Sequence, residues 1–113
     1  MEHRHYRFDG TRTLAALAPC LVGVVASGNL EVLIEPARLD GGCTVDVATA
    51  MAGFGNVWDA VIGDFHDRHR LADVRIDIND NGATPATVSL RLEQAVAEYA
   101  AGAGAGVDAN ADA

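Results

Sequence analysis

The stretch Leu21-Val-Gly-Val-Val-Ala-Ser-Gly-Asn-Leu-Glu-Val-Leu-Ile-Glu35 decides the fold of this chain. Its first part is a short run rich in β-branched residues, which favour strands. From residue 30 onward, the apolar residues 30, 32 and 34 face one way while Glu31 and Glu35 face the other, which is the period of a half-buried strand. Ser27-Gly28-Asn29 separates the two halves with residues typical of turns. The stretch therefore predicts a β-hairpin with Ser27 in its turn.

Strand signals continue on both sides of this hairpin. Pro36 ends the second strand, and Asp40-Gly41-Gly42 supplies a turn before residues 43–47, which alternate again. The order predicts an antiparallel meander. Upstream, residues 3–8 alternate weakly and predict an edge strand, while residues 74–79 alternate clearly and predict a further half-buried strand.

Two segments have the period of amphipathic helices. The first runs from Asn56, a good N-cap with Asp59 completing an approximate capping box, and places its apolar residues three and four apart. The second follows Thr84-Pro85, a favourable cap and first-turn pair. Residues 88–92 also alternate like a strand, so 85–93 is open between strand and helix. We favour a helix because the apolar stripe continues to Tyr99.

These elements predict an α+β fold, in which a small antiparallel β-sheet of four or five strands is covered on one face by two amphipathic helices. The chain has 113 residues, enough for one domain with a single core. We assign that domain to residues 1–100. Residues 101–113 form an Ala/Gly/Asp tail with nothing to bury, which we expect to be disordered.

Composition excludes several classes of function. With 16 acidic and 8 basic side chains the formal charge is −8, which repels phosphate backbones and argues against nucleic-acid binding. No apolar run approaches the length of a membrane span, so we expect no membrane insertion. Two cysteines, Cys20 and Cys43, make no disulfide framework and indicate reduced thiols in the cytoplasm. The apolar residues 14–26 after Arg4, Arg7 and Arg12 are a weak match to a cleaved leader.

Few residues suggest chemistry on their own. Asp77-x-Asn79-x-Asn81-Gly82 copies the start of a calcium loop, but Val88 stands where a bidentate Glu is needed. His66 and His69 have a spacing that can chelate a metal, but a solvated helical face explains them better. No catalytic triad is recognisable. A turn serine such as Ser27 is ordinarily only a turn residue.

A family resemblance changes the interpretation of Ser27. The passages Gly23-Val-Val-Ala-Ser-Gly-Asn-Leu-Glu-Val-Leu33, Asp80-Asn-Gly-Ala-Thr-Pro85 and Leu90-Arg-Leu-Glu-Gln94 resemble the acyl-carrier, or delta, subunit of malonate decarboxylase, which is related to the acyl-carrier subunit of citrate lyase. Together with the residues between them they span roughly residues 20–99. The first passage resembles the family's Ser-Gly-Asp-Met-Glu-Val-Leu attachment motif, with Asn29 in place of Asp and Leu30 in place of Met.

The resemblance implies a cofactor-bearing role. In the family this serine bears 2'-(5''-triphosphoribosyl)-3'-dephospho-CoA through a phosphodiester, so Ser27 would be the covalent attachment site. Gly28 and Asn29 would form the attachment turn, and Glu31 matches the motif. The chain would then be a non-catalytic cytoplasmic carrier of acetyl and malonyl thioesters in a hetero-oligomer. Its implied partners are an acyl-carrier transferase subunit, carboxyltransferase-like decarboxylase subunits, a malonyltransferase and a prosthetic-group transferase.

Three other functions stay open at this point. The first is the sister carrier of citrate lyase, although residues 82–85 and 31–33 favour malonate. The second is a small exported binding module with a cleaved leader, which cleavage after Ala26 would produce. The third is a structural subunit of an assembly, for which Ser27→Ala would leave function unchanged.

Overall fold

The computed structural model describes residues 1–14, 20–24 and 27–112; the side chains of residues 20, 22–24, 27–28 and 102–112 are not described. No helix among the described residues is long and apolar enough to cross a membrane. In chain order the elements are β1 (Glu2–Asp9), β2 (Arg12–Thr13), β3 (Cys20–Val24), β4 (Ser27–Pro36), β5 (Gly42–Thr49), α1 (Gly55–His69), β6 (Leu71–Ala72), β7 (Val74–Asp80) and α2 (Pro85–Asp112).

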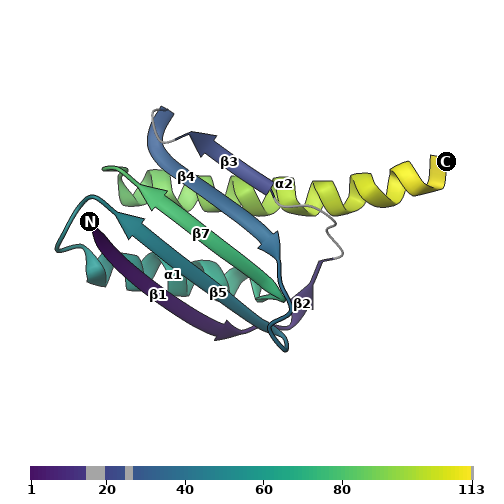
Figure 1. Cartoon of the computed structure of the whole chain (residues 1–113), viewed down its shortest axis with the longest axis horizontal. Coiled ribbons are helices and arrows are strands. Elements are labelled where there is room, and N and C mark those ends of the chain that lie inside the picture. The colour runs from purple at the N-terminus through teal and green to yellow at the C-terminus, as the bar shows by residue number, and fades with distance from the viewer. Residues whose placement is uncertain (15–19, 25–26, 113) are drawn as a thin grey trace.

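The main sheet has five strands among the described residues, in the order β1-β5-β7-β4-β3, and β2 pairs with β6 beside it. Both helices lie against the same face of this sheet, and α2 projects beyond it (Figure 1). Strand β1 is at the edge, as residues 3–8 predicted, and pairs antiparallel with β5. The predicted α+β class with two helices on one face is confirmed.

One strand pair departs from the predicted antiparallel sheet. Strand β7 lies between β4 and β5, so these two strands are not neighbours, and β7 runs parallel to β5. The predicted antiparallel meander, in which β4 and β5 would be neighbours, is therefore wrong. The sheet is mixed because α1 connects β5 to β7 as a crossover, the connection that parallel neighbours require. A turn at residues 40–42 reverses the chain but does not say which strand lies beside which.

Asp73 holds the connection that passes from β4 to β5 around the start of β7. Its carboxylate Oδ1 accepts hydrogen bonds from the backbone N–H of Leu39 at 3.1 Å and of Gly41 at 2.9 Å. The backbone of Asp73, with a φ of 57°, also bonds to both sides of this loop, donating to Gly42 and accepting from Ala37. Hydrogen bonds from the backbone of Gly41 and Leu39 lower the pKa of Asp73.

The core lies between the sheet and the helices. Apolar side chains that alternate along the three central strands meet the stripes of both helices, and all are at most 1% exposed: Leu30, Val32, Ile34, Val45, Val47, Ile76, Ile78, Ile62, Phe65, Leu92 and Tyr99. Burying a side chain of this size contributes about 1.5–3 kcal/mol. The opposite face of the sheet is polar, because Asp46, Arg75 and Asp77 point away from the helices.

The start of α1 differs from the predicted cap. The helix begins at Gly55 after Phe54, and no side chain caps it, so Asn56 lies within the first turn. Asp59 does not complete a capping box. Instead it accepts hydrogen bonds from Tyr6 Oη at 2.7 Å and Arg4 Nη2 at 2.9 Å, which join β1 to α1. These bonds, led by that of Tyr6, lower the pKa of Asp59.

Helix α2 settles the ambiguous segment 85–93 in favour of a helix. The predicted cap is present, because the Thr87 backbone N–H donates to Thr84 Oγ1 at 3.2 Å. Helix α2 continues to Asp112, within residues 101–113, for which we expected a disordered tail. The disorder of residues 101–113 stays a prediction. The domain boundary at residue 100 stays a prediction.

Candidate functional site

Ser27 lies at one end of the sheet, at the beginning of β4. Its backbone pairs with Val24 of β3, and the pairing register shifts between Val22 and Val24. Ser27 is therefore a strand residue and not a turn residue, and residues 25–26 lie outside the described residues. The side-chain environment of Ser27 and Gly28 is not described either. The predicted antiparallel strand pair is present, but Ser27-Gly28-Asn29, which we expected in its turn, belong to β4.

Asn29 joins this strand end to a second part of the chain. It is exposed and has a φ of 59°, a left-handed conformation that asparagine tolerates better than most residues. Its carbonyl oxygen accepts a hydrogen bond from the backbone N–H of Asn81 at 2.8 Å. Two of the passages that resemble the carrier family, the one around Ser27 and the one at residues 80–85, therefore meet at one end of the molecule.

The loop that follows β7 is held by Asp80. This residue is 5% exposed, and its carboxylate accepts hydrogen bonds from Thr49 Oγ1 and from the Ala83 backbone N–H, each at 2.8 Å. Gly82 turns the chain with a φ of 103°, a conformation open to glycine. These hydrogen bonds, together with that of Asn81 to Asn29, fix the position of the loop between β5, the start of β4 and the start of α2.

Glu31 points to the polar face of the sheet. It lies opposite Asn79 of β7, whose Nδ2 donates a hydrogen bond to Glu31 Oε1 at 3.3 Å. Because side chains alternate along a strand, Glu31 shares a face with the odd-numbered residues of β4 and not with buried Leu30 and Val32. This hydrogen bond links the neighbouring strands β4 and β7.

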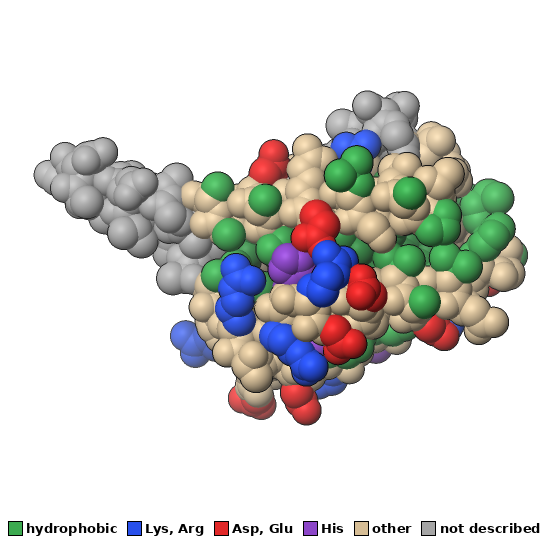
Figure 2. All heavy atoms as spheres, turned by 180° about the vertical axis from the view of Figure 1, so that it is seen from behind, with side chains coloured by type: hydrophobic (Ala, Val, Ile, Leu, Met, Phe, Trp, Pro, Cys, Tyr) green, Lys and Arg blue, Asp and Glu red, His purple; other side chains and the backbone are tan. Residues whose placement is uncertain are grey.

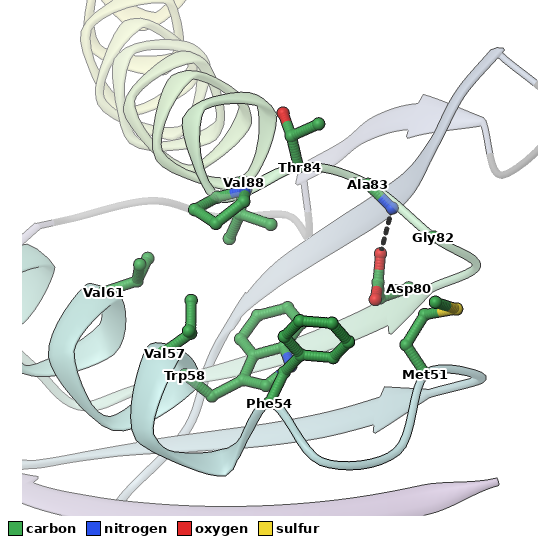
Figure 3. A pocket seen from close by; sticks show the side chains of 11 residues that line it. Met51, Phe54, Val57, Trp58, Val61, Asp80, Gly82, Ala83, Thr84 and Val88 are labelled. Atoms are coloured by element: carbon green, nitrogen blue, oxygen red, sulfur yellow. Dashed lines mark hydrogen bonds between the residues drawn. The ribbon is translucent and has the colours of Figure 1, made fainter.

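A pocket opens between the N-terminal ends of the two helices (Figure 3). Its volume is about 250 Å³. Trp58 of α1 forms part of the wall and is 5% exposed, while Met51 and Phe54 stand at the entrance, 44% and 46% exposed. Gly82 and other residues of the Asp80 loop line the opposite side. None of the described lining residues is Lys, Arg or His.

Sequence patterns did not reveal this pocket. Val57 and Val61 fit the apolar stripe of a helix, which predicted burial in the core, yet Val57 is 37% exposed. An apolar pair before the helix, Met51 and Phe54, was the available signal. Viewed from the helix side, hydrophobic side chains gather at this end of the molecule, and charged ones lie nearer the middle (Figure 2). Exposed apolar groups around a cavity are typical of binding sites.

The two histidines of α1 have different surroundings. His66 is 3% exposed, stacks on Phe8 with ring centroids 4.4 Å apart, and has Nε2 3.1 Å from the Asp9 carbonyl oxygen. It therefore belongs to the packing of β1 on α1, and the expected solvated face is wrong for this residue. His69 Nε2 lies 2.7 Å from Glu93 Oε2 of α2. Burial, followed by the charges of Arg68 and Arg12, lowers the pKa of His69.

The calcium-like series is divided between a strand and a loop. Asp77 and Asn79 belong to β7 and share its polar face, whereas Asn81 follows the strand. Burial raises the pKa of Asp77, and the neighbouring charge of Asp46 raises it further. Among the residues that the structure describes, no group of three or more His, Cys, Asp or Glu side chains could hold a metal ion.

Comparison with known proteins identifies a family for this arrangement. The family model described as "Malonate decarboxylase delta subunit (MdcD)" matches residues 18–99. A malonate decarboxylase acyl carrier protein of Stenotrophomonas maltophilia is 61% identical over 103 residues, which cover 90% of this chain and 97% of that protein. One of Burkholderia cepacia is 57% identical, with coverage of 88% and 92%.

A solved structure agrees in fold. A chain in the crystal structure of a Pseudomonas malonate decarboxylase hetero-tetramer in complex with malonate superposes with a TM-score of 0.76 at 36% identity. The match covers 88% of this chain and 99% of that one. Sequence resemblance, family model and fold therefore agree, and this chain belongs to the malonate decarboxylase delta subunit family of acyl carrier proteins.

Proposed function

We propose that this chain is the acyl carrier of a malonate decarboxylase and that Ser27 bears 2'-(5''-triphosphoribosyl)-3'-dephospho-CoA through a phosphodiester. The thiol of that group would carry acetyl and malonyl units as thioesters. The observation that carries the proposal is the meeting of the Ser27 strand with the loop at residues 80–85 through the Asn29–Asn81 hydrogen bond of 2.8 Å. Both segments belong to passages that resemble the family.

The described residues around Ser27 fit a covalent arm. Attachment requires a hydroxyl on a protruding part of a rigid scaffold. Ser27 opens a strand at the end of the sheet, next to exposed Asn29, and this end is anchored by the buried Asp80 carboxylate. Gly28 has no side chain that could obstruct the neighbouring oxygen. In this role Ser27, Gly28, Asn29 and Glu31 present the arm, and no residue of the chain breaks or forms bonds in the substrate.

The charge of the chain suits a carrier that visits several partners. A net charge of −8 accelerates encounters with basic surfaces more than it prolongs binding. We infer that the partners are an acyl-carrier transferase subunit, carboxyltransferase-like decarboxylase subunits, a malonyltransferase and the enzyme that attaches the prosthetic group. The protein would work in the cytoplasm, where these partners and malonate are available.

Mass spectrometry of the intact protein tests the attachment. The chain has two serines, Ser27 and Ser89, so the matched pair Ser27→Ala and Ser89→Ala separates the site from a general effect of removing a hydroxyl. In the native host growing on malonate, we expect a dephospho-CoA-derived adduct on wild type and Ser89→Ala, and none on Ser27→Ala. Hydroxylamine should remove an acyl group from the thioester and leave the phosphodiester adduct.

Growth on malonate provides the functional readout. Ser27→Ala should abolish malonate decarboxylation while its urea unfolding curve stays close to that of wild type, because the substitution removes one hydroxyl from the first residue of β4. An unmodified wild-type chain from cells that consume malonate contradicts the proposal. So does a Ser27→Ala strain that retains full decarboxylase activity, which would indicate a purely structural subunit.

A further inference from the structure

We propose that the pocket between α1 and α2 receives the acetyl-thioester end of the arm carried by the same chain, and that it disfavours the malonyl form. The inference rests on the proposed attachment at Ser27. The chemical class of the ligand is a short, uncharged acyl thioester of a pantetheine chain. The pocket is formed by Met51, Phe54, Trp58, the Asp80 loop and the first turn of α2.

The pocket and Ser27 lie at the same end of the molecule. From Ser27 the path runs along two residues to Asn29, across the hydrogen bond to Asn81, and on to Gly82, which lines the pocket. Standard backbone dimensions make this path less than about 20 Å. The pantetheine chain has about as many chain atoms as four amino-acid residues, or about 14 Å when extended, and the ribosyl and phosphate units add to its reach.

The size of the pocket indicates a small occupant. Sites for drug-sized ligands have volumes of about 300–1,000 Å³. At about 250 Å³, this pocket accommodates the end of a chain and not a whole nucleotide or a peptide segment. Its entrance offers the thioether of Met51 and the ring of Phe54, and sulfur atoms make favourable contacts with aromatic rings. A thioester sulfur with a methyl group beyond it fits such walls.

The charges around the pocket separate the two acyl groups. An acetyl group is neutral, whereas a malonyl group ends in a carboxylate. No described lining residue is basic, and the single charged one, Asp80, is acidic with both oxygens already hydrogen-bonded. A malonyl carboxylate would lose its water without gaining a partner and would be repelled by Asp80. The pocket is therefore expected to hold the acetyl form and leave the malonyl form free for its partner enzyme.

Trp58 provides a direct test, because it is the one tryptophan of the chain and lies in the pocket wall. We would titrate the full-length Ser27→Ala protein with S-acetyl-pantetheine, malonyl-pantetheine and pantetheine, and follow its fluorescence. Tethering supplies an effective concentration on the order of millimolar, so a dissociation constant in that range is sufficient. We expect saturable binding of S-acetyl-pantetheine and at least tenfold weaker binding of malonyl-pantetheine.

A matched pair of surface variants locates the binding. Val57 is 37% exposed at the pocket, whereas Leu90 is 70% exposed on α2 and does not line it. Val57→Lys places a cation beside the entrance and should improve malonyl-pantetheine binding at least threefold while weakening that of S-acetyl-pantetheine. Leu90→Lys should change neither. Equal effects of the two substitutions would overturn the assignment to this pocket.

The free ligands keep this test independent of the attachment. Ser27→Ala cannot be loaded, so binding in trans supports the pocket whether or not Ser27 bears the arm, and mass spectrometry decides the attachment separately. No saturable change with S-acetyl-pantetheine up to about 20 mM would overturn the inference, given the millimolar effective concentration of a tethered group. Equal affinity for acetyl and malonyl forms would overturn the selectivity. A Trp58 change seen only with purified partner subunits would assign the pocket to protein docking instead.

Discussion

Replacing Asp80 with alanine tests how the loop between β7 and α2 is held. The residue is 5% exposed, and its carboxylate accepts hydrogen bonds of 2.8 Å from Thr49 Oγ1 and from the Ala83 backbone N–H. Alanine leaves the Ala83 N–H without this acceptor and leaves Thr49 Oγ1 only the Met51 carbonyl oxygen at 3.5 Å, and each unsatisfied buried polar group costs about 1–3 kcal/mol. Because Ala83 is only half-buried, we expect Asp80→Ala to lower the free energy of unfolding by about 3 kcal/mol.

Urea unfolding followed by far-UV circular dichroism measures this loss. Small domains are stable by about 5–15 kcal/mol, so the midpoint should fall clearly while the slope stays constant. In a domain of this size the melting temperature should drop by about 12 °C or more. Asp80→Asn keeps one oxygen for Ala83 and should cost only about 1 kcal/mol. The control is Asp67→Ala, whose side chain is 73% exposed and pairs with Arg70 at 3.5 Å, and which should change stability by less than about 0.5 kcal/mol.

Two results would refute the reasoning about Asp80. If Asp80→Ala stays within about 0.5 kcal/mol of wild type at an unchanged slope, the two hydrogen bonds do not hold the loop. If Asp80→Asn lowers the free energy of unfolding as much as Asp80→Ala does, an amide of the same shape with one acceptor oxygen does not hold the loop. The negative charge of the carboxylate would then be required. The same variants should weaken S-acetyl-pantetheine binding in order of their effect on stability, because the loop forms one side of the pocket.

Three further predictions follow from local geometry. A Cβ on Gly10 would lie 1.9 Å from the Leu71 carbonyl oxygen, so Gly10→Ala should lower the free energy of unfolding in urea by more than about 2 kcal/mol. Gly63 of α1 has open space around it, so Gly63→Ala should raise that free energy by up to about 1 kcal/mol. Equal effects of the two substitutions would contradict the close approach of Gly10 to Leu71. Backbone hydrogen bonds lower the pKa of Asp73 from its ordinary 3.8, so its contribution is present above that pH and is lost as the pH falls through the lower folded-state value. The difference in free energy of unfolding between wild type and Asp73→Asn should therefore be constant from neutral pH down to about 4.5 and shrink below 3.8. A difference that grows on acidification would contradict a lowered pKa of Asp73. Burial raises the pKa of Cys43 from 9.0 to about 11, so iodoacetamide at pH 8 should label Cys43 only after unfolding, as peptide mapping would show; rapid labelling of the native protein would contradict its burial.

Local periodicity was sufficient for most of the elements. The alternation in residues 30–35 and 74–79, and the helical stripes after residues 56 and 84, each depend on neighbours within a few positions, so the chain order of these strands and helices could be predicted. The Thr84 cap is equally local. The capping box proposed for Asn56 and Asp59 was wrong because a distant strand supplies Asp59 with better partners, Arg4 and Tyr6.

The candidate attachment residue was also accessible from the sequence, through the resemblance around Ser27. Its place in the fold was not, because Ser27 begins β4 and is not a turn residue. A turn signal spread over several small residues does not specify which of them pair across the hairpin, since register depends on what each face of the strand buries.

The sequence by itself determined the helices, the strands, the acidic charge and the family motif, because these are properties of short segments or of composition. Only the tertiary structure decided that β7 lies between β4 and β5, that Asp80 is buried, and that Asn29 meets Asn81. The pocket beside Trp58 likewise exists only where the starts of two helices and one loop converge. Such features depend on contacts between residues far apart in the chain, whose pairing no local pattern encodes.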